Sequence, residues 1–225
     1  LAGLSAGQPD GRAEWYDAAR DAYLQSLLPP AQPGDVDMGV ITAHIQAQLP
    51  DDAIITHGAG NFAIWANKFM QFGRDQRLLG PQSGSMGFGV PAALAAKAHD
   101  SSRFVLCFAG DGDFQMNGTE LGTALQAGLH PVILILNNSS YGTIRMHQER
   151  EYPARVSGTE IVNPDYVALA GAYGFHGERV TRTDDFAAAY ARALAAPAGA
   201  IIEIVIDTEA IAPRSTISDL RAAAG

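Results

Sequence analysis

The sequence has 225 residues, of which 47% are hydrophobic and 17% charged, and its formal net charge is −9. This hydrophobic content predicts an ordered chain of one large or two small globular domains. An acidic chain without a basic run is a poor ligand for nucleic acid or an anionic membrane, and no run reaches the roughly 18 apolar residues of a spanning helix. The one cysteine, Cys107, excludes an internal disulfide framework and favours a reducing compartment, so we expect a cytoplasmic protein.

The N-terminal part is predicted to be a helix followed by a linker. Residues 12–28 carry apolar side chains at helical spacing, and we expect these side chains, Trp15 among them, to pack. The run Pro-Pro-Ala-Gln-Pro-Gly at 29–34 is typical of a stiff linker. We therefore predict a domain over residues 35–210 and a C-terminal tail over 211–225. Because the chain begins with Leu rather than Met, we expect it to be processed or to be part of a longer chain.

From residue 35 onward, predicted helices and strands alternate. The predicted helices cover residues 38–48, 61–72, 88–98, 118–128, 142–149, 164–172 and 184–196. The predicted strands cover residues 53–56, 77–79, 103–109, 132–136, 176–181 and 200–206. We expect Asn117 to cap the helix that follows it, with Glu120 reaching back, and Trp65 to pack in the core. Continuous apolar strands between helices are typical of an α/β fold, a doubly wound, mostly parallel sheet with helices on both faces.

Four of the predicted strands end in glycine-rich or polar loops. These loops are residues 57–61 (HGAGN), 80–87 (GPQSGSMG), 110–113 (GDGD) and 137–142 (NNSSYG). Because parallel strands bring their carboxyl ends to one edge of the sheet, we expect a ligand to bind there. Free backbone N–H groups and helix N-termini suit a phosphate, and the oxygens of Asp111 and Asn138 suit Mg²⁺ or Ca²⁺.

Each loop taken alone is also a common turn sequence, and one of them fits a second ligand. Gly58 to Ala63 matches the looser G-x-G-x-x-A pattern of a dinucleotide site, with Asp75 further on. An NAD(P)-binding dehydrogenase domain is therefore an alternative interpretation. However, Asp75 falls just past a predicted helix, whereas a ribose-binding acid belongs at the end of a strand.

The spacing of two of these loops carries a resemblance to a known family. Gly110-Asp111-Gly112 is followed, after 24 residues that form one helix and one strand, by Asn137-Asn138. This order resembles the cofactor signature of thiamine-diphosphate enzymes. From about residue 35 to 207 the chain is similar to the diphosphate-binding domain of the acetolactate synthase, pyruvate oxidase and benzoylformate decarboxylase family. Residues 1–34 are then similar to the end of that family's middle domain and the linker after it.

The resemblance implies thiamine diphosphate and Mg²⁺ as cofactors and assigns residues to them. The implied metal ligands are the side chains of Asp111 and Asn138 and the carbonyl oxygen of Ser140. Met86 matches the residue that supports the bent cofactor. The implied cofactor-binding residues are Gly60, Asn61, Ser85, Met86, Gly110, Asp111, Gly112, Asp113, Asn138, Ser140, Tyr141, Gly142 and Thr143. Asp113 departs from the small or hydroxyl residue usual in the family, so we expect it to contribute its backbone alone.

The resemblance also implies an activity that needs a second domain. Family members act on 2-oxo acids as decarboxylases or carboligases, and their activating glutamate belongs to a pyrimidine-binding domain of the same or another subunit. We therefore expect no catalytic residue on this chain, and a homodimer or homotetramer in the full-length protein. Acetolactate synthases usually carry a tryptophan where this chain has His147, which leaves the substrate open. The resemblance implies that the helix carrying His147 and Arg145 flanks the substrate, and a role for these two side chains is one alternative to a structural one. A non-catalytic relative is the remaining alternative.

Overall fold

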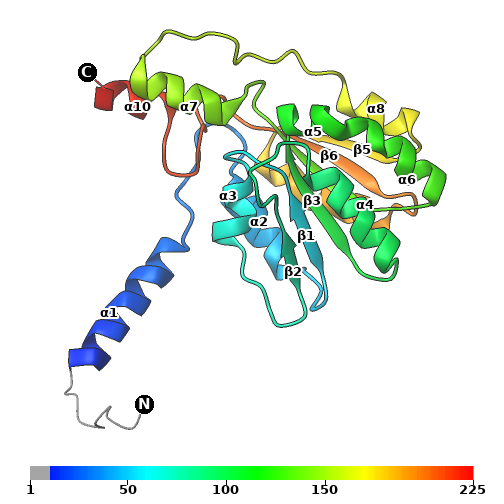
Figure 1. The fold of residues 1–225 in the computed structure, drawn as a ribbon, viewed down its shortest axis with the longest axis horizontal. Coiled ribbons are helices and arrows are strands. Elements are labelled where there is room, and N and C mark those ends of the chain that lie inside the picture. The colour runs from blue at the N-terminus through cyan, green and yellow to red at the C-terminus, as the bar shows by residue number, and fades with distance from the viewer. Residues whose placement is uncertain (1–10, 225) are drawn as a thin grey trace.

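The computed structural model describes residues 11–224 and contains one sheet of six parallel strands (Figure 1). The strands are β1 (Ile54–His57), β2 (Arg77–Leu79), β3 (Val105–Gly110), β4 (Val132–Asn137), β5 (His176–Val180) and β6 (Ala200–Val205). Their order across the sheet is β2-β1-β3-β4-β6-β5. The predicted fold class is confirmed, and all described pairings between strands are parallel.

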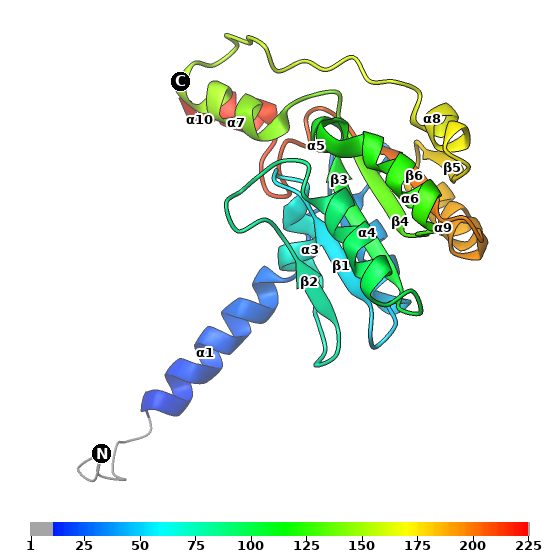
Figure 2. The ribbon, with the colours of Figure 1, turned by 45° about the vertical axis from the view of Figure 1, so that its right-hand side comes forward.

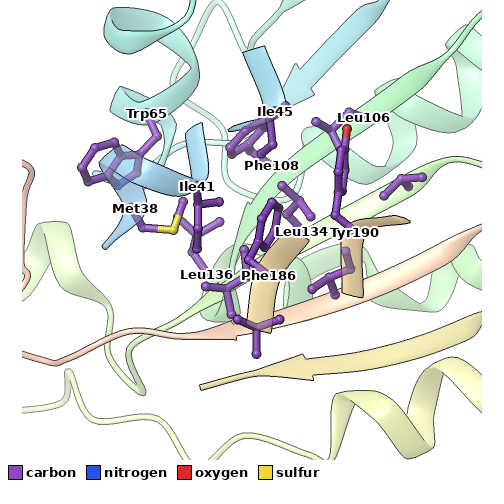
Figure 3. Packing of buried hydrophobic residues seen from close by; sticks show 14 of the residues in the cluster. Met38, Ile41, Ile45, Trp65, Leu106, Phe108, Leu134, Leu136, Phe186 and Tyr190 are labelled. Atoms are coloured by element: carbon purple, nitrogen blue, oxygen red, sulfur yellow. The ribbon is translucent and has the colours of Figure 1, made fainter. Parts of the chain in front are cut away.

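One face of the sheet is covered by α2 (Met38–Ala47), α3 (Ala63–Phe69) and α9 (Phe186–Ala195). Figure 3 shows Phe108 and Leu134 of the central strands packed among Ile41 of α2 and Phe186 and Tyr190 of α9. Each fully buried side chain of this size contributes about 1.5–3 kcal/mol relative to the exposed state. Trp65 joins this core and is 4% exposed, which confirms its predicted packing.

The opposite face is covered by α4 (Gly89–His99), α5 (Asp111–Asn117), α6 (Leu121–Ala127) and α8 (Tyr166–Ala172). Alternate residues of β3 point to the two cores: Leu106 and Phe108 to the first, and Cys107 and Ala109 to the second. This alternation follows from the pleat of a strand that is buried on both faces. Cys107 is accordingly a buried core residue with a free thiol.

The segment after β3 differs from the prediction. Instead of a loop and a helix over 118–128, α5 begins at Asp111, a 3-10 turn covers Gly118–Glu120, and α6 follows. The predicted cap is wrong, because Asn117 makes no capping hydrogen bond and its side chain donates to the carbonyl oxygen of Gly87 at 2.9 Å. Gly112 and Asn117 are weak helix formers, so the sequence does not predict α5, which is stabilised by packing.

The N-terminal helix α1 (Gly11–Ser26) projects away from the sheet (Figures 1 and 2). Its apolar side chains face solvent in the described structure, and Trp15 is 72% exposed. The expectation that Trp15 packs is therefore wrong for the described part of the chain. The helix itself lies where the sequence predicts it.

Two helices lie side by side beyond the carboxyl edge of the sheet, α7 (Gly142–Glu151) and α10 (Ile217–Ala224) (Figures 1 and 2). The sequence predicts α7 but not α10, which falls in the C-terminal tail. A long segment, residues 152–165, connects α7 to α8 across the molecule, and we call it the strap. Within residues 11–224, no helix combines the length and apolar character that crossing a bilayer requires.

Candidate functional site

A cleft that is partly open to solvent lies at the carboxyl edge of the sheet. Every residue that the resemblance assigned to the cofactor lines this cleft, with one exception. Those residues are Gly60, Asn61, Met86, Gly110, Asp111, Gly112, Asp113, Asn138, Ser140, Tyr141, Gly142 and Thr143. The exception is Ser85, which is exposed and hydrogen-bonded through its hydroxyl to Ser83 at 2.7 Å. The topology thus brings together loop residues as far apart in the sequence as Asn61 and Thr143, which are separated by 82 positions, because the strands before these loops are parallel.

Three glycines of the cleft, Gly60, Gly110 and Gly112, leave no room for side chains. A Cβ at Gly60 or at Gly110 would lie 2.7 Å from the ring of Phe62, and one at Gly112 would meet the ring of Tyr141. Gly60 also has a φ of 155°, a backbone conformation that other residues rarely adopt. The loops therefore present bare backbone to the cleft, which is the surface that a phosphate group needs for close approach.

Asp111 brings a buried carboxylate to the cleft. Asp111 is 2% exposed. Its Oδ1 accepts a hydrogen bond from the backbone N–H of Gly112 (2.9 Å), and its Oδ2 accepts one from Asn163 Nδ2 (2.8 Å). Burial raises the pKa of this carboxyl, and the hydrogen bond from Asn163 opposes the rise. A buried carboxylate that faces a cleft is suited to a cation, which would offset its desolvation.

Asn138 and Ser140 bring neutral oxygens to the same cleft. The turn that carries them is tight: Ser139 has a φ of 53°, and Ser140 N–H donates to Asn138 Oδ1 at 3.1 Å. Residues 11–224 contain no cluster of three or more His, Cys, Asp or Glu side chains that could hold a metal. A cation bound by Asp111 would therefore need neutral oxygens and the oxygens of its ligand besides the carboxylate. That set fits Mg²⁺ bound together with a diphosphate.

Asp113 has a role that the sequence did not predict. Its buried carboxylate accepts hydrogen bonds through Oδ1 from Gly87 N–H (2.8 Å) and Ala59 N–H (3.1 Å), so it joins two other loops of the cleft. The side chain of Asp113 thus orders the loops of the cleft, and the expectation that Asp113 offers the cofactor its backbone alone stays a prediction. Burial raises its pKa to about 6, and the two N–H groups oppose that rise. Oδ2 is buried without a hydrogen-bond partner among the described residues.

Asn61 connects the cleft to the C-terminal segment. Its backbone N–H donates to Thr143 Oγ1 at 3.0 Å, and its Nδ2 donates to the carbonyl oxygen of Ile211 at 2.9 Å. The C-terminal segment therefore forms part of the wall of the cleft. The wall residues that the sequence analysis missed are Ala59, Phe62, Trp65, Leu136, Ile144, Ile206, Ala210, Ile211, Ala212 and Pro213. Only Phe62 and Trp65 carried a usable signal, since they follow the first glycine loop at helical spacing.

Arg145, His147 and Asp75, which the sequence analysis names, lie outside the cleft lining, as does His57 of the first glycine-rich loop. Arg145 Nε donates to Glu149 at 2.8 Å, and His147 is exposed on α7. His57 is buried, with its Nδ1 2.7 Å from the carbonyl oxygen of Gly58 and its ring against Gly80. Asp75 is exposed, and its backbone carbonyl accepts from Arg103. Because Asp75 is not at the site, the dinucleotide interpretation loses its ribose-binding acid.

Comparisons with known proteins agree with this geometry. The family model described as "Thiamine pyrophosphate enzyme, C-terminal TPP binding domain" matches residues 58–204. The large subunit of acetolactate synthase isozyme 2 from Escherichia coli (strain K12) is 33% identical over 203 residues, which are 89% of this chain and 37% of the relative. The acetolactate synthase large subunit from Parasynechococcus marenigrum (strain WH8102) is 34% identical over 187 residues, 82% of this chain and 30% of the relative.

A solved structure supports the same assignment. The thiamine diphosphate-dependent 4-hydroxybenzoylformate decarboxylase of Rhodococcus jostii RHA1 is similar with a TM-score of 0.70 and 31% identity, covering 80% of this chain and 34% of that one. This chain thus spans about a third of the length of these relatives. With its fold, its cleft and these matches in agreement, the chain belongs to the family of C-terminal thiamine pyrophosphate-binding domains of thiamine pyrophosphate enzymes.

Proposed function

We propose that this chain is the diphosphate- and Mg²⁺-binding part of a thiamine-diphosphate-dependent 2-oxo acid decarboxylase or carboligase that resembles acetolactate synthase. One observation carries the proposal: Asp111, Asn138 and Ser140 line the same cleft as the exposed glycine backbone at Gly60 and Gly110. A charged oxygen, two neutral oxygens and bare backbone are what a diphosphate with its cation requires. The related synthases and the similar decarboxylase support the choice of reaction class.

In this proposal each part of the cleft has one task. Asp111, Asn138 and the carbonyl oxygen of Ser140 would hold Mg²⁺, and the backbone at Gly60 and Gly112 would approach the diphosphate. When bound, thiamine diphosphate supplies an electron sink for the carbanion left by loss of carbon dioxide from a 2-oxo acid. Met86, which lines the same cleft, would support the rings of the cofactor. The described residues hold the cofactor and leave the choice among 2-oxo acids open.

The reaction also needs a partner in this proposal. The chain spans about a third of its relatives, so we propose that a pyrimidine-binding domain of the same or another subunit completes the site and supplies the activating glutamate. The full-length protein would be a homodimer or homotetramer, and the isolated chain would not catalyse. A cytoplasmic location also stays a prediction, which cell fractionation would test.

The decisive experiment is cofactor binding by an Asp111→Ala variant of the complete protein. Isothermal titration with thiamine diphosphate and Mg²⁺ should show binding to the wild type and its loss in the variant, since Asp111 is the anionic side chain among the proposed ligands. Asp75→Ala is the matched control, because Asp75 is exposed, lies outside the cleft, and hydrogen-bonds through its backbone. Unchanged binding by Asp111→Ala, or binding of NAD(P) that Asp75→Ala weakens, would contradict the proposal.

A further inference from the structure

The second oxygen of Asp111 is held by a residue from a distant part of the chain. Asn163 Nδ2 donates to Asp111 Oδ2 at 2.8 Å, although 52 residues separate the two in the sequence. Asn163 does not line the cleft; it lines a separate open groove, together with Asn137, Arg179 and Glu203. The strap therefore reaches Asp111 from the side that faces away from the cleft.

The amide of Asn163 is itself fixed in orientation. Its Oδ1 accepts hydrogen bonds from Gln115 Nε2 at 2.8 Å and from the hydroxyl of the buried Tyr166 at 3.0 Å. With both of these groups donating to the oxygen, the nitrogen faces Asp111. Asn163 therefore offers Asp111 a donor that cannot rotate away without breaking two other hydrogen bonds.

The same amide group continues into a network beneath the sheet edge. Asn163 Nδ2 also donates to Asn137 Oδ1 at 2.8 Å, and Asn137 Nδ2 donates to the buried Glu203 at 2.7 Å. Arg179 Nε donates to the other oxygen of Glu203 at 2.6 Å. Two neighbouring residues at the end of β4 thus face opposite ways: Asn138 faces the cleft, and Asn137 faces the hydrogen-bond network behind it.

We propose that Asn163 is a positioning residue for the metal site: it holds the carboxylate of Asp111 in the orientation that binds the cation. This inference rests on the proposed function, since it assumes that Asp111 binds Mg²⁺. A carboxylate at a strand end can rotate about its side-chain bonds, and each wrong orientation lowers its affinity for a cation in the cleft. Outer partners of metal ligands restrict that rotation, and their loss typically costs about 10–100-fold in metal affinity.

The test compares metal affinity with turnover in the complete protein. In Asn163→Ala we expect the Mg²⁺ concentration for half-maximal binding of thiamine diphosphate to rise about 10–100-fold. Binding of Mn²⁺, followed by its electron paramagnetic resonance signal, should weaken by a similar factor. At saturating Mg²⁺ and cofactor, turnover should return to near the wild-type value, because Asn163 itself contacts neither ligand.

Two further variants control the experiment. Gln115 is exposed, so Gln115→Ala should fold normally. The substitution removes one of the two hydrogen bonds to Asn163 Oδ1 and should weaken Mn²⁺ binding by about two- to tenfold. Val162, beside Asn163 in the strap, is 98% exposed, and Val162→Ala should bind Mn²⁺ like the wild type. If Asn163→Ala fails to fold, Gln115→Ala decides the result.

The outcomes separate this inference from the proposed function. If the wild type binds cofactor with Mg²⁺ and Asp111→Ala does not, while folded Asn163→Ala stays within about threefold of the wild type in metal affinity, the positioning role is overturned and the proposed function stands. Gln115→Ala with unchanged Mn²⁺ affinity overturns it equally when Asn163→Ala cannot be prepared. If the wild type binds neither Mn²⁺ nor the cofactor with Mg²⁺, the proposed function fails and this inference fails with it.

Discussion

Gly58 and Asp113 occupy adjoining space so closely that residue 58 cannot carry a side chain. A Cβ at position 58 would overlap both carboxylate oxygens of Asp113. The same carboxylate accepts the N–H groups of Ala59 and Gly87. The absence of a side chain at Gly58 is therefore what allows one buried carboxylate to join three loops of the cleft.

Gly58→Ala should accordingly destabilise the protein by about 1–3 kcal/mol, the usual cost of adding atoms to a packed site. In an Asp113→Ala background, the same substitution should cost clearly less, because the overlapping carboxylate is gone. Thermal or denaturant unfolding of the four proteins gives the coupling. Gly171→Ala is the control, since Gly171 lies in α8 with open space around it and should be neutral or slightly stabilising. If the effects of the two substitutions on the free energy of unfolding are additive, the close approach of Gly58 to Asp113 does not contribute to stability.

Removal of the Asp113 carboxylate should loosen two loops at once. Asp113→Ala leaves the N–H groups of Ala59 and Gly87 without their acceptor, so their amide hydrogens should exchange faster by about tenfold or more. Asp113→Asn can still present one oxygen to both N–H groups and should keep most of the protection. Hydrogen exchange read by mass spectrometry or NMR measures both variants. Equal exchange in the alanine variant and the wild type would refute the role of this side chain.

The sequence predicts the sheet well because its strands are continuous apolar runs, as in β4, and such runs need no distant partner to be recognised. The sequence also predicts the edge of the sheet at which the cleft lies, since parallel strands bring their carboxyl ends to one edge. It fails where the structure depends on distant pairs. Asn163 donates to Asp111 across 52 residues, and Asn61 donates to the carbonyl of Ile211 across 150. No local pattern marks either contact.

Two errors have a local cause. α5 is absent from the prediction because Gly112 and Asn117 are weak helix formers, yet acidic residues in its first turn and packing of Phe114 stabilise it. Trp15 was expected to pack because its helix has an apolar side, but the described residues provide no surface against that side. A pattern of apolar residues indicates that a face will be covered, and it does not say by which part of a protein.

Met86→Ala should lower turnover of the complete protein more than it lowers affinity for thiamine diphosphate. Met86 lines the cleft, but it lies on a different loop from the proposed metal and diphosphate ligands. Its loss should leave the diphosphate contacts intact and disturb the geometry in which the reacting groups meet. Titration calorimetry and steady-state kinetics on one preparation provide the comparison. Equal losses in both quantities, or no loss in either, would contradict a role in shaping the bound cofactor.

The last prediction concerns pH and the attachment of α10 to α7. Glu149 is 1% exposed; it accepts hydrogen bonds from Arg221 of α10 at 2.8 Å and from Arg145 at 2.8 Å. Arg221, assisted by the N–H of Ala154 and by Arg145, lowers the pKa of Glu149 from 4.5 to about 2 despite its burial. Since the folded pKa lies below the unfolded one, this group stabilises the docked helix fully above about pH 4.5 and progressively less as the pH falls toward 2.

Glu149→Gln should therefore weaken the docking of α10 by about 2 kcal/mol at pH 7, as expected for hydrogen bonds to a charged group. The difference from the wild type should shrink below pH 4.5 and vanish only below about pH 2, where the wild-type carboxyl is also neutral. Hydrogen exchange of the α10 amides across this range, corrected for the intrinsic pH dependence of exchange, measures the local opening directly. Glu151→Gln is the matched control, because Glu151 ends the same helix, is exposed, and forms no ion pair among the described residues. An effect of Glu149→Gln that stays constant from pH 7 to pH 2 would show that the carboxylate charge does not hold α10, and that packing of Ile217 and its neighbours does.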